Sequence, residues 1–168
     1  MVGPGIGKSR FAATLFAKMK ELNFNVELVT EFAKDCVYEK QFELLQTDQL
    51  FVLANQNRRL QRLETSNENI QYAINDSPLL LSKIFANVNN VPHNFISLND
   101  FVVDLFKSYD NINIVLKRDQ STFNQSGRIQ TLQESVQIDQ LIIKELNFWK
   151  IPYILVDSDD INSVLNLF

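Results

Sequence analysis

A glycine-rich stretch at the start of the chain constrains the fold more than any other feature. Residues 2–9 read Val-Gly-Pro-Gly-Ile-Gly-Lys-Ser and match the P-loop pattern at every position except the first, where Val2 replaces a glycine. Apolar residues then recur at helical spacing from Phe11 to Leu22, which predicts an amphipathic helix over residues 8–22. Because glycines let backbone N–H groups face phosphate oxygens at a helix start, we predict a phosphate site. The alternative is an ordinary glycine turn before a helix.

A phosphate site of this kind gives its residues separate roles. Lys8 is predicted to reach the β- and γ-phosphates of ATP, and the Ser9 hydroxyl is predicted to ligate Mg²⁺. The predicted nucleotide contacts are Gly3, Gly5, Ile6, Gly7, Lys8, Ser9 and Arg10.

Composition excludes several classes of protein. The 168 residues are 45% hydrophobic, which suits a single globular domain over residues 1–168. A net charge of -4 gives no overall attraction to nucleic acid, so DNA could bind only through a local basic face. Apolar runs are far shorter than a membrane span, and we expect no membrane association. A lone cysteine, Cys36, favours a reducing cytoplasm, and Cys36 and His93 are interpreted as structural.

Strands that alternate with helices predict an α/β fold with a parallel sheet covered on both faces. Apolar runs predict strands ending near residues 29, 74, 116 and 156, and further helices over 47–63, 79–86, 98–106, 131–148 and 161–167. Thr131 and Glu134 form a predicted capping box. The polar stretch 119–130 has no apolar periodicity and predicts a mobile loop, a candidate lid over residues 118–131.

Polar residues follow the predicted strands at the edge where open α/β sheets bind ligands. Asp76 comes after the strand ending at Ile74 and suits either a Mg²⁺ partner or a catalytic base. Its alternative role is a helix cap in Asp-Ser-Pro. Glu31 ends the first predicted strand and is a candidate substrate contact, ahead of nearby Lys34.

The remaining predictions concern three cations and an amide. Gln56 and Arg59 lie at i and i+3 on what we expect to be the polar face of helix 47–63, where they could bind the acceptor. A solvated basic face is the alternative. Arg118 and Arg128 bracket the candidate lid and are predicted to stabilise a migrating phosphoryl group.

Five segments together resemble P-loop nucleoside and nucleotide kinase-like proteins, particularly small ATP-binding proteins of tailed bacteriophages. They are residues 3–9, 29–35, 48–50 with Gln56 and Arg59, 75–79, and 123–128. The resemblance implies a nucleotide-monophosphate-kinase-like fold with a five-stranded parallel sheet, an Asp after the third strand and an Arg-bearing lid. Some proteins of this group are deoxynucleotide kinases, and similar phage enzymes phosphorylate a hydroxymethylated pyrimidine within DNA.

The chain departs from this group at its start. Besides Val2, the apolar strand that should precede the P-loop is missing, so we expect a fragment or a wrongly assigned start. Restoring about six apolar residues upstream is expected to raise both stability and ATP affinity.

The sequence therefore predicts Mg²⁺-ATP-dependent phosphoryl transfer to a nucleoside or nucleotide, without an evident protein partner. Two alternatives remain open at this point. One is a DNA kinase acting on a modified base, and the other is a regulatory module or slow NTPase with a protein partner.

Overall fold

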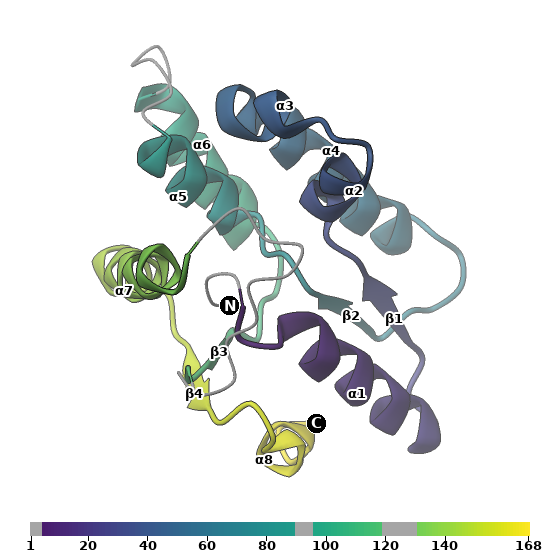
Figure 1. Cartoon of the computed structure of the whole chain (residues 1–168). Coiled ribbons are helices and arrows are strands. Elements are labelled where there is room, and N and C mark those ends of the chain that lie inside the picture. The colour runs from purple at the N-terminus through teal and green to yellow at the C-terminus, as the bar shows by residue number, and fades with distance from the viewer. Residues whose placement is uncertain (1–4, 90–95, 119–130) are drawn as a thin grey trace. The chain divides into compact units, whose positions relative to one another are not determined.

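The computed structural model describes residues 5–89, 96–118 and 131–168 (Figure 1). The chain divides into two compact units, one made of Met1–Phe24 with Ile112–Phe168 and the other of Asn25–Asn111. In the described parts of the chain, each unit contains one pair of parallel strands surrounded by helices.

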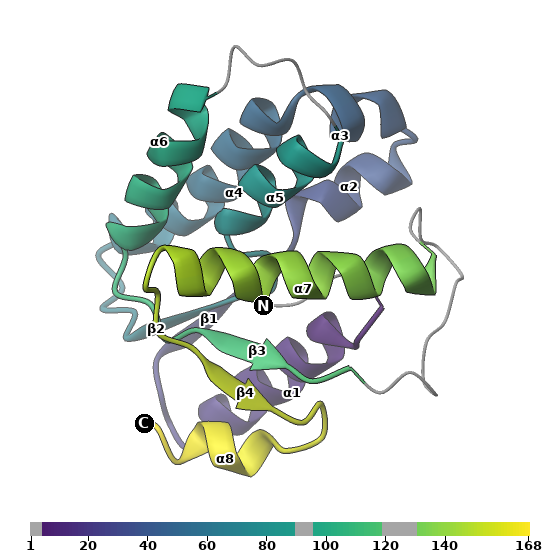
Figure 2. The same ribbon diagram turned by 90° about the vertical axis from the view of Figure 1, so that its left-hand side faces the viewer.

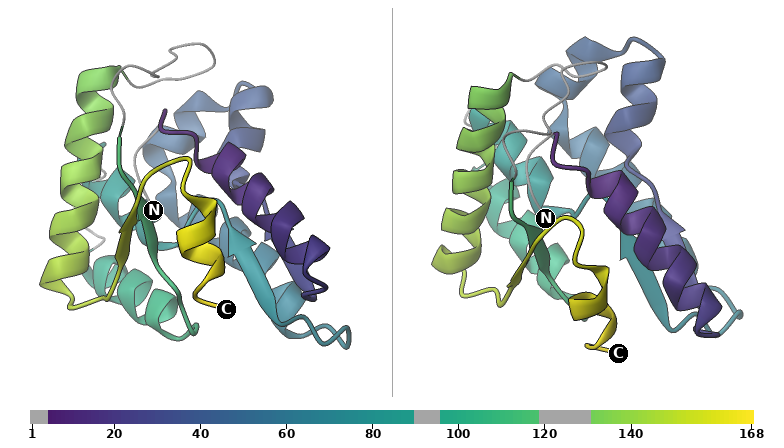
Figure 3. Two further views of the ribbon diagram at one scale, coloured as in Figure 1. Left: turned by 90° about the horizontal axis from the view of Figure 1, so that it is seen from below. Right: turned by 60° about the horizontal axis from the view of Figure 1, so that its bottom comes forward.

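The first unit is built from both ends of the chain. It comprises α1 (Lys8–Glu21), β3 (Ile114–Leu116), α7 (Leu132–Phe148), β4 (Ile154–Val156) and α8 (Ile161–Leu165). β3 and β4 pair in parallel, with Ile114 opposite Ile154 and Leu116 opposite Val156. Figures 2 and 3 show α7 along one side of this strand pair and α8 on the other, where α8 packs against α1.

Helical periodicity explains which faces of α1 and α7 are buried. In α1 the buried side chains include Phe11, Leu15 and Met19, spaced by four residues. The buried residues of α7 include Ile138, Ile142 and Leu146, which have the same spacing. Both helices therefore cover the core as the sequence predicts.

The predicted capping box at the start of α7 is confirmed. The Thr131 hydroxyl accepts a hydrogen bond from the Glu134 N–H, and the Glu134 carboxylate accepts from the Thr131 N–H at 2.7 Å. The carboxylate also accepts from the Thr131 hydroxyl at 2.9 Å, and the two hydrogen bonds that it accepts from Thr131 lower the pKa of Glu134. The charged form is thus favoured by folding, and this contribution is lost as the pH falls through the lowered pKa.

Thr131→Ala should destabilise the protein by about 1 kcal/mol, because it removes the side-chain acceptor at the start of α7. Urea unfolding measures this change. Thr14→Ala is the control, since Thr14 is an exposed threonine inside α1 and alanine is the better helix former. Equal stability of the Thr131→Ala protein and the parent would show that the cap does not contribute.

The second unit is continuous in sequence. It comprises β1 (Val26–Val29), α2 (Phe32–Tyr38), α3 (Phe42–Thr47), α4 (Gln49–Glu64), β2 (Tyr72–Asn75), α5 (Leu80–Val88) and α6 (Ile96–Lys107). β1 and β2 pair in parallel, with Val26 opposite Tyr72 and Val29 opposite Asn75. α4 contacts both strands and α5, and α5 packs against α6 (Figure 1).

The strands and helices predicted from periodicity are found, with small shifts at their ends, and the fold is α/β. The described strands form two parallel pairs, whereas one continuous parallel sheet was expected. Two short helices, α2 and α3, were not predicted. The predicted mobile loop covers residues 119–130, and the missing first strand was expected to lead into residues 1–4. Both ranges lie outside the described residues. The single domain stays a prediction. Among the described helices, none is long and apolar enough to cross a membrane.

Candidate functional site

The loop before α1 has the backbone geometry that a phosphate cradle needs. Gly5 and Gly7 have φ angles of 93° and 88°, a left-handed conformation that other residues adopt only with strain. Ile6 between them is buried and anchors the loop to the core of its unit. The Phe11 N–H donates to the Gly7 carbonyl oxygen at 2.9 Å, which starts the helix. Both glycines are therefore required by the backbone.

The amino end of α1 is open to an anion. Gly7 is the N-cap and provides no capping side chain, and the first turn of α1 contains no acidic residue. The two longer helices, α4 and α7, instead begin with a side-chain oxygen that caps the first turn. The start of a helix carries the positive end of the helix dipole, which attracts an anion. This geometry fits a phosphate group of a nucleotide.

Lys8 and Ser9 follow the glycines directly, as the P-loop pattern requires. Lys8 is partly exposed and Ser9 is exposed, so both side chains can reach a bound nucleotide. No cluster of three metal-ligating residues occurs in the parts of the chain that are described. Mg²⁺ bound with ATP uses one or two protein groups, substrate phosphates and water, and Ser9 suits such a site. Gly3, a predicted contact, lies outside the described residues.

Arg10 links the start of α1 to the segment after β4. Its Nη2 donates to the Ser158 carbonyl oxygen at 3.1 Å. Because Ser158 follows the carboxyl end of β4, this bond holds the P-loop helix beside that edge of the β3–β4 pair. Contact between Arg10 and a bound nucleotide stays a prediction.

Arg118 is held by a carboxylate that sequence reasoning missed. It follows β3, and its Nε donates to Asp139 Oδ2 of α7 at 2.5 Å. The two side chains are 8% and 18% exposed. By contrast, the neighbouring pair of Lys117 and Asp157, 3.1 Å apart, is more than half exposed. The burial distinguishes Arg118 from a surface cation, although its action on a phosphoryl group stays a prediction, and Arg128 lies outside the described residues.

Asp76 stands at the carboxyl end of β2 and is 8% exposed. Its N–H donates to the Val29 carbonyl oxygen at 3.0 Å, so its backbone is attached to the end of β1. The assigned N-cap of α5 is Leu79, which makes no side-chain cap hydrogen bond, and the alternative that Asp76 caps this helix stays a prediction. The carboxylate is thus placed by the strand pair, at the edge predicted for ligand binding.

The expected exposed position of Gln56 is wrong. Gln56 is 3% exposed, whereas the apolar residues Leu50 and Phe51 of the same helix are 45% and 43% exposed. The Gln56 side chain accepts from the Phe32 N–H at 2.8 Å and donates to the Thr30 carbonyl oxygen at 3.3 Å. Its amide therefore bonds backbone groups of the segment that follows β1, which explains why a polar residue occupies a core position.

Arg59 is also engaged with the end of β1. Its Nη1 donates to the Thr30 hydroxyl at 2.9 Å and carbonyl at 3.1 Å, and its Nη2 donates to the Asp35 carboxylate. The guanidinium lies 5.4 Å from the centre of the Phe32 ring. Glu31, the N-cap of α2, is partly exposed and makes no side-chain cap hydrogen bond. Substrate contacts for Gln56, Arg59 and Glu31 stay predictions.

Cys36 and His93 were both interpreted as structural. Cys36 is 1% exposed, and its burial raises the pKa of the thiol, which keeps the thiol protonated at neutral pH. This environment agrees with a structural role for Cys36, and His93 lies outside the described residues.

The structure groups the predicted residues by unit. The P-loop and Arg118 belong to the first unit, and Glu31, Gln56, Arg59 and Asp76 belong to the second. In the second unit these four residues gather around the carboxyl ends of β1 and β2. Asp139, Asn75 and Phe32 were not predicted as site residues. Asn75 and Phe32 had a signal in the sequence, since Asn75 directly precedes Asp76 and Phe32 directly follows Glu31.

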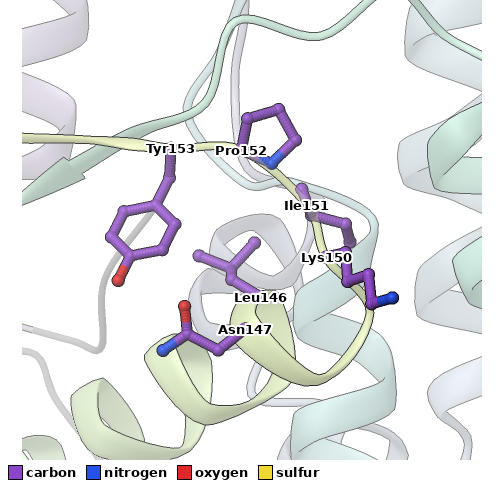
Figure 4. A pocket seen from close by; sticks show the side chains of 6 residues that line it. All are labelled: Leu146, Asn147, Lys150, Ile151, Pro152 and Tyr153. Atoms are coloured by element: carbon purple, nitrogen blue, oxygen red, sulfur yellow. The ribbon is translucent and has the colours of Figure 1, made fainter.

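One shallow pocket lies away from these residues. It measures about 350 Å³ and is lined by the turn between α7 and β4, as shown in Figure 4 by Leu146, Asn147, Lys150, Ile151, Pro152 and Tyr153. This turn leads into the amino end of β4, whereas Arg10 donates to the Ser158 carbonyl oxygen, beyond the carboxyl end of β4. The pocket is therefore separate from the P-loop.

Comparison with known proteins decides the family. The model of a family described as AAA domain matches residues 3–163, which is nearly the whole chain. The chain belongs to the AAA domain family. This AAA domain is a P-loop, nucleotide-binding domain with the parallel α/β fold expected for that class. No curated protein and no solved structure matches it. The resemblance to phage kinase-like proteins stays a prediction.

Proposed function

We propose that this AAA domain is a Mg²⁺-ATP-dependent phosphotransferase with a nucleoside or nucleotide acceptor. The observation that supports it most is the uncapped start of α1 after two glycines with positive φ, followed at once by Lys8 and Ser9. This arrangement suits the triphosphate of ATP. We further propose the nucleotide-monophosphate-kinase-like version of the P-loop fold.

In this proposal Gly5 to Ser9 hold the triphosphate, and Lys8 neutralises charge on its β- and γ-phosphates. Mg²⁺ would be held by the Ser9 hydroxyl and would supply further charge neutralisation. Asp76 accepts the proton of the acceptor hydroxyl, whose oxygen bonds to the γ-phosphorus as the bond to the bridging oxygen of ADP breaks. Arg118 and Arg128 stabilise the charge on the transferred group.

The acceptor is proposed to bind at the end of β1 in the second unit. Phe32 offers an aromatic ring flanked by Phe51, 5.6 Å between ring centres, and by the Arg59 guanidinium. A nucleobase can stack on such a ring, and the Glu31 carboxylate can accept a hydrogen bond from a sugar hydroxyl. These groups suit a nucleoside better than a plain alcohol.

The test is transfer from γ-labelled ATP to a panel of nucleosides, nucleotides and DNA with hydroxymethylated pyrimidines. We expect label in a nucleoside or nucleotide. Label in DNA alone, with binding that weakens steeply with salt, would replace this proposal with the DNA kinase. Release of free phosphate without any labelled acceptor would contradict transfer and favour a slow NTPase.

A further inference from the structure

We propose that Gln56 is a positioning residue for Asp76 and acts through Asn75. The inference rests on the proposed function, because it assigns Asp76 the role of base. In this proposal Gln56 does not bind the substrate directly, as the sequence predicted, but positions Asp76.

The link runs through one oxygen atom. Asn75 Oδ1 accepts a hydrogen bond from Gln56 Nε2 at 3.0 Å and another from the Ser77 N–H at 3.1 Å. The bond to Ser77 closes a turn in which an Asn side chain bonds to the backbone two residues on. Asp76 is the residue enclosed by that turn. Gln56 thus fixes the amide that shapes the backbone on both sides of Asp76.

The other bonds of Gln56 and Asp76 anchor the same place. The Asp76 N–H donates to the Val29 carbonyl oxygen, the last residue of β1. Gln56 holds the next residues of that segment through the Thr30 carbonyl oxygen and the Phe32 N–H. A single buried side chain therefore ties the ends of both strands and the start of α2 together.

Burial makes this network selective for one arrangement. Because Gln56 is 3% exposed, water cannot easily replace a lost partner, and the geometry with all partners in place is strongly preferred. A base must lie within hydrogen-bond reach of the proton that it removes, so a small displacement of Asp76 slows transfer. Gln56 needs no contact with substrate to have this effect.

The chain contains a matched control on the same helix. Gln49 is also buried, at 5% exposed. Its Nε2 donates to the carbonyl oxygen of Leu45 in α3, the helix that precedes α4. Gln49→Met and Gln56→Met remove the same amide from the same helix. Only the second change breaks the link to Asn75.

The experiment measures kcat, KM and amide hydrogen exchange in the full chain. We expect Gln56→Met to lower kcat by about 10–100-fold, with little change in the KM for ATP, and to speed exchange of the Ser77 N–H. Gln49→Met should leave kcat, the KM for ATP and the exchange of the Ser77 N–H unchanged. In an Asp76→Asn background, Gln56→Met should lower kcat little further, because the base that it positions is gone.

A second pair of variants guards against a misfolded Gln56→Met protein. Asn75→Ala removes the shared oxygen and should reproduce the loss of kcat and the faster Ser77 exchange. Asn75→Asp keeps an oxygen for both donors and should retain slow exchange. If Ser77 exchange and kcat stay at parental values in both Gln56→Met and Asn75→Ala, the positioning role is overturned.

The positioning role and the proposed function fail in different ways. Absence of any phosphoryl transfer by the parent would overturn the proposed function. Faster Ser77 exchange in Gln56→Met would still support the link from Gln56 to the Asp76 turn. Unchanged exchange would refute that link whether or not the parent transfers phosphate.

Discussion

A Lys8→Ala protein should fold like the parent and bind ATP about 10–100-fold more weakly. Lys8 follows Gly7 at the start of α1, which has no acidic residue in its first turn, and its charge is expected to add to the attraction of the helix dipole for a phosphate. Hydrogen bonds to charged groups contribute about 1.5–3 kcal/mol, which corresponds to this range of affinity. Isothermal titration calorimetry with Mg²⁺-ATP measures the change.

Lys18→Ala is the matched control for this change. Lys18 lies on the same helix but near its other end, is about half exposed, and pairs with Glu21 at 3.0 Å. Its loss should leave ATP affinity unchanged. A folded Lys8→Ala protein with parental affinity and turnover would refute the phosphate site.

Asp76→Asn should reduce phosphoryl transfer by about 10² or more, with a melting temperature close to that of the parent. The substitution keeps the size of the side chain and removes its capacity to accept a proton. Asparagine also caps helices about as well as aspartate, so the start of α5 should be unaffected. Single-turnover kinetics with labelled ATP and thermal unfolding measure the two quantities.

Asp48→Asn controls for the loss of one carboxylate from the same unit. Asp48 caps α4 by accepting from the Phe51 N–H at 2.9 Å, and asparagine caps nearly as well. We expect parental activity. Transfer by Asp76→Asn within a few-fold of the parent would eliminate the catalytic role.

Local sequence patterns were sufficient for the elements that depend on neighbouring residues. The spacing of Phe11 and Leu15 predicted α1, and Thr131 with Glu134 predicted the start of α7, because caps and amphipathic faces involve residues three or four apart. The P-loop was predictable for the same reason. Gly5 and Gly7 are required by the local backbone.

Long-range pairing explains what the sequence did not reveal. Gln56 was expected on the polar face of its helix because amides usually face water, but its partners Phe32 and Asn75 are 24 and 19 residues away. The pair of Arg118 and Asp139 spans 21 residues. No periodicity along one helix encodes such partners. The helices α2 and α3, of 7 and 6 residues, are too short for a clear periodic signal.

The ratio of phosphorylated acceptor to ADP tests the central proposal most directly. Parent protein, Mg²⁺, γ-labelled ATP and the best acceptor of the panel are incubated together, and both products are quantified over time. Transfer through the P-loop predicts one labelled acceptor for each ADP, and Lys8→Ala should lower both products in parallel. ADP formed with an equal amount of free phosphate, and unaffected by any acceptor, would contradict the account and make the protein an NTPase.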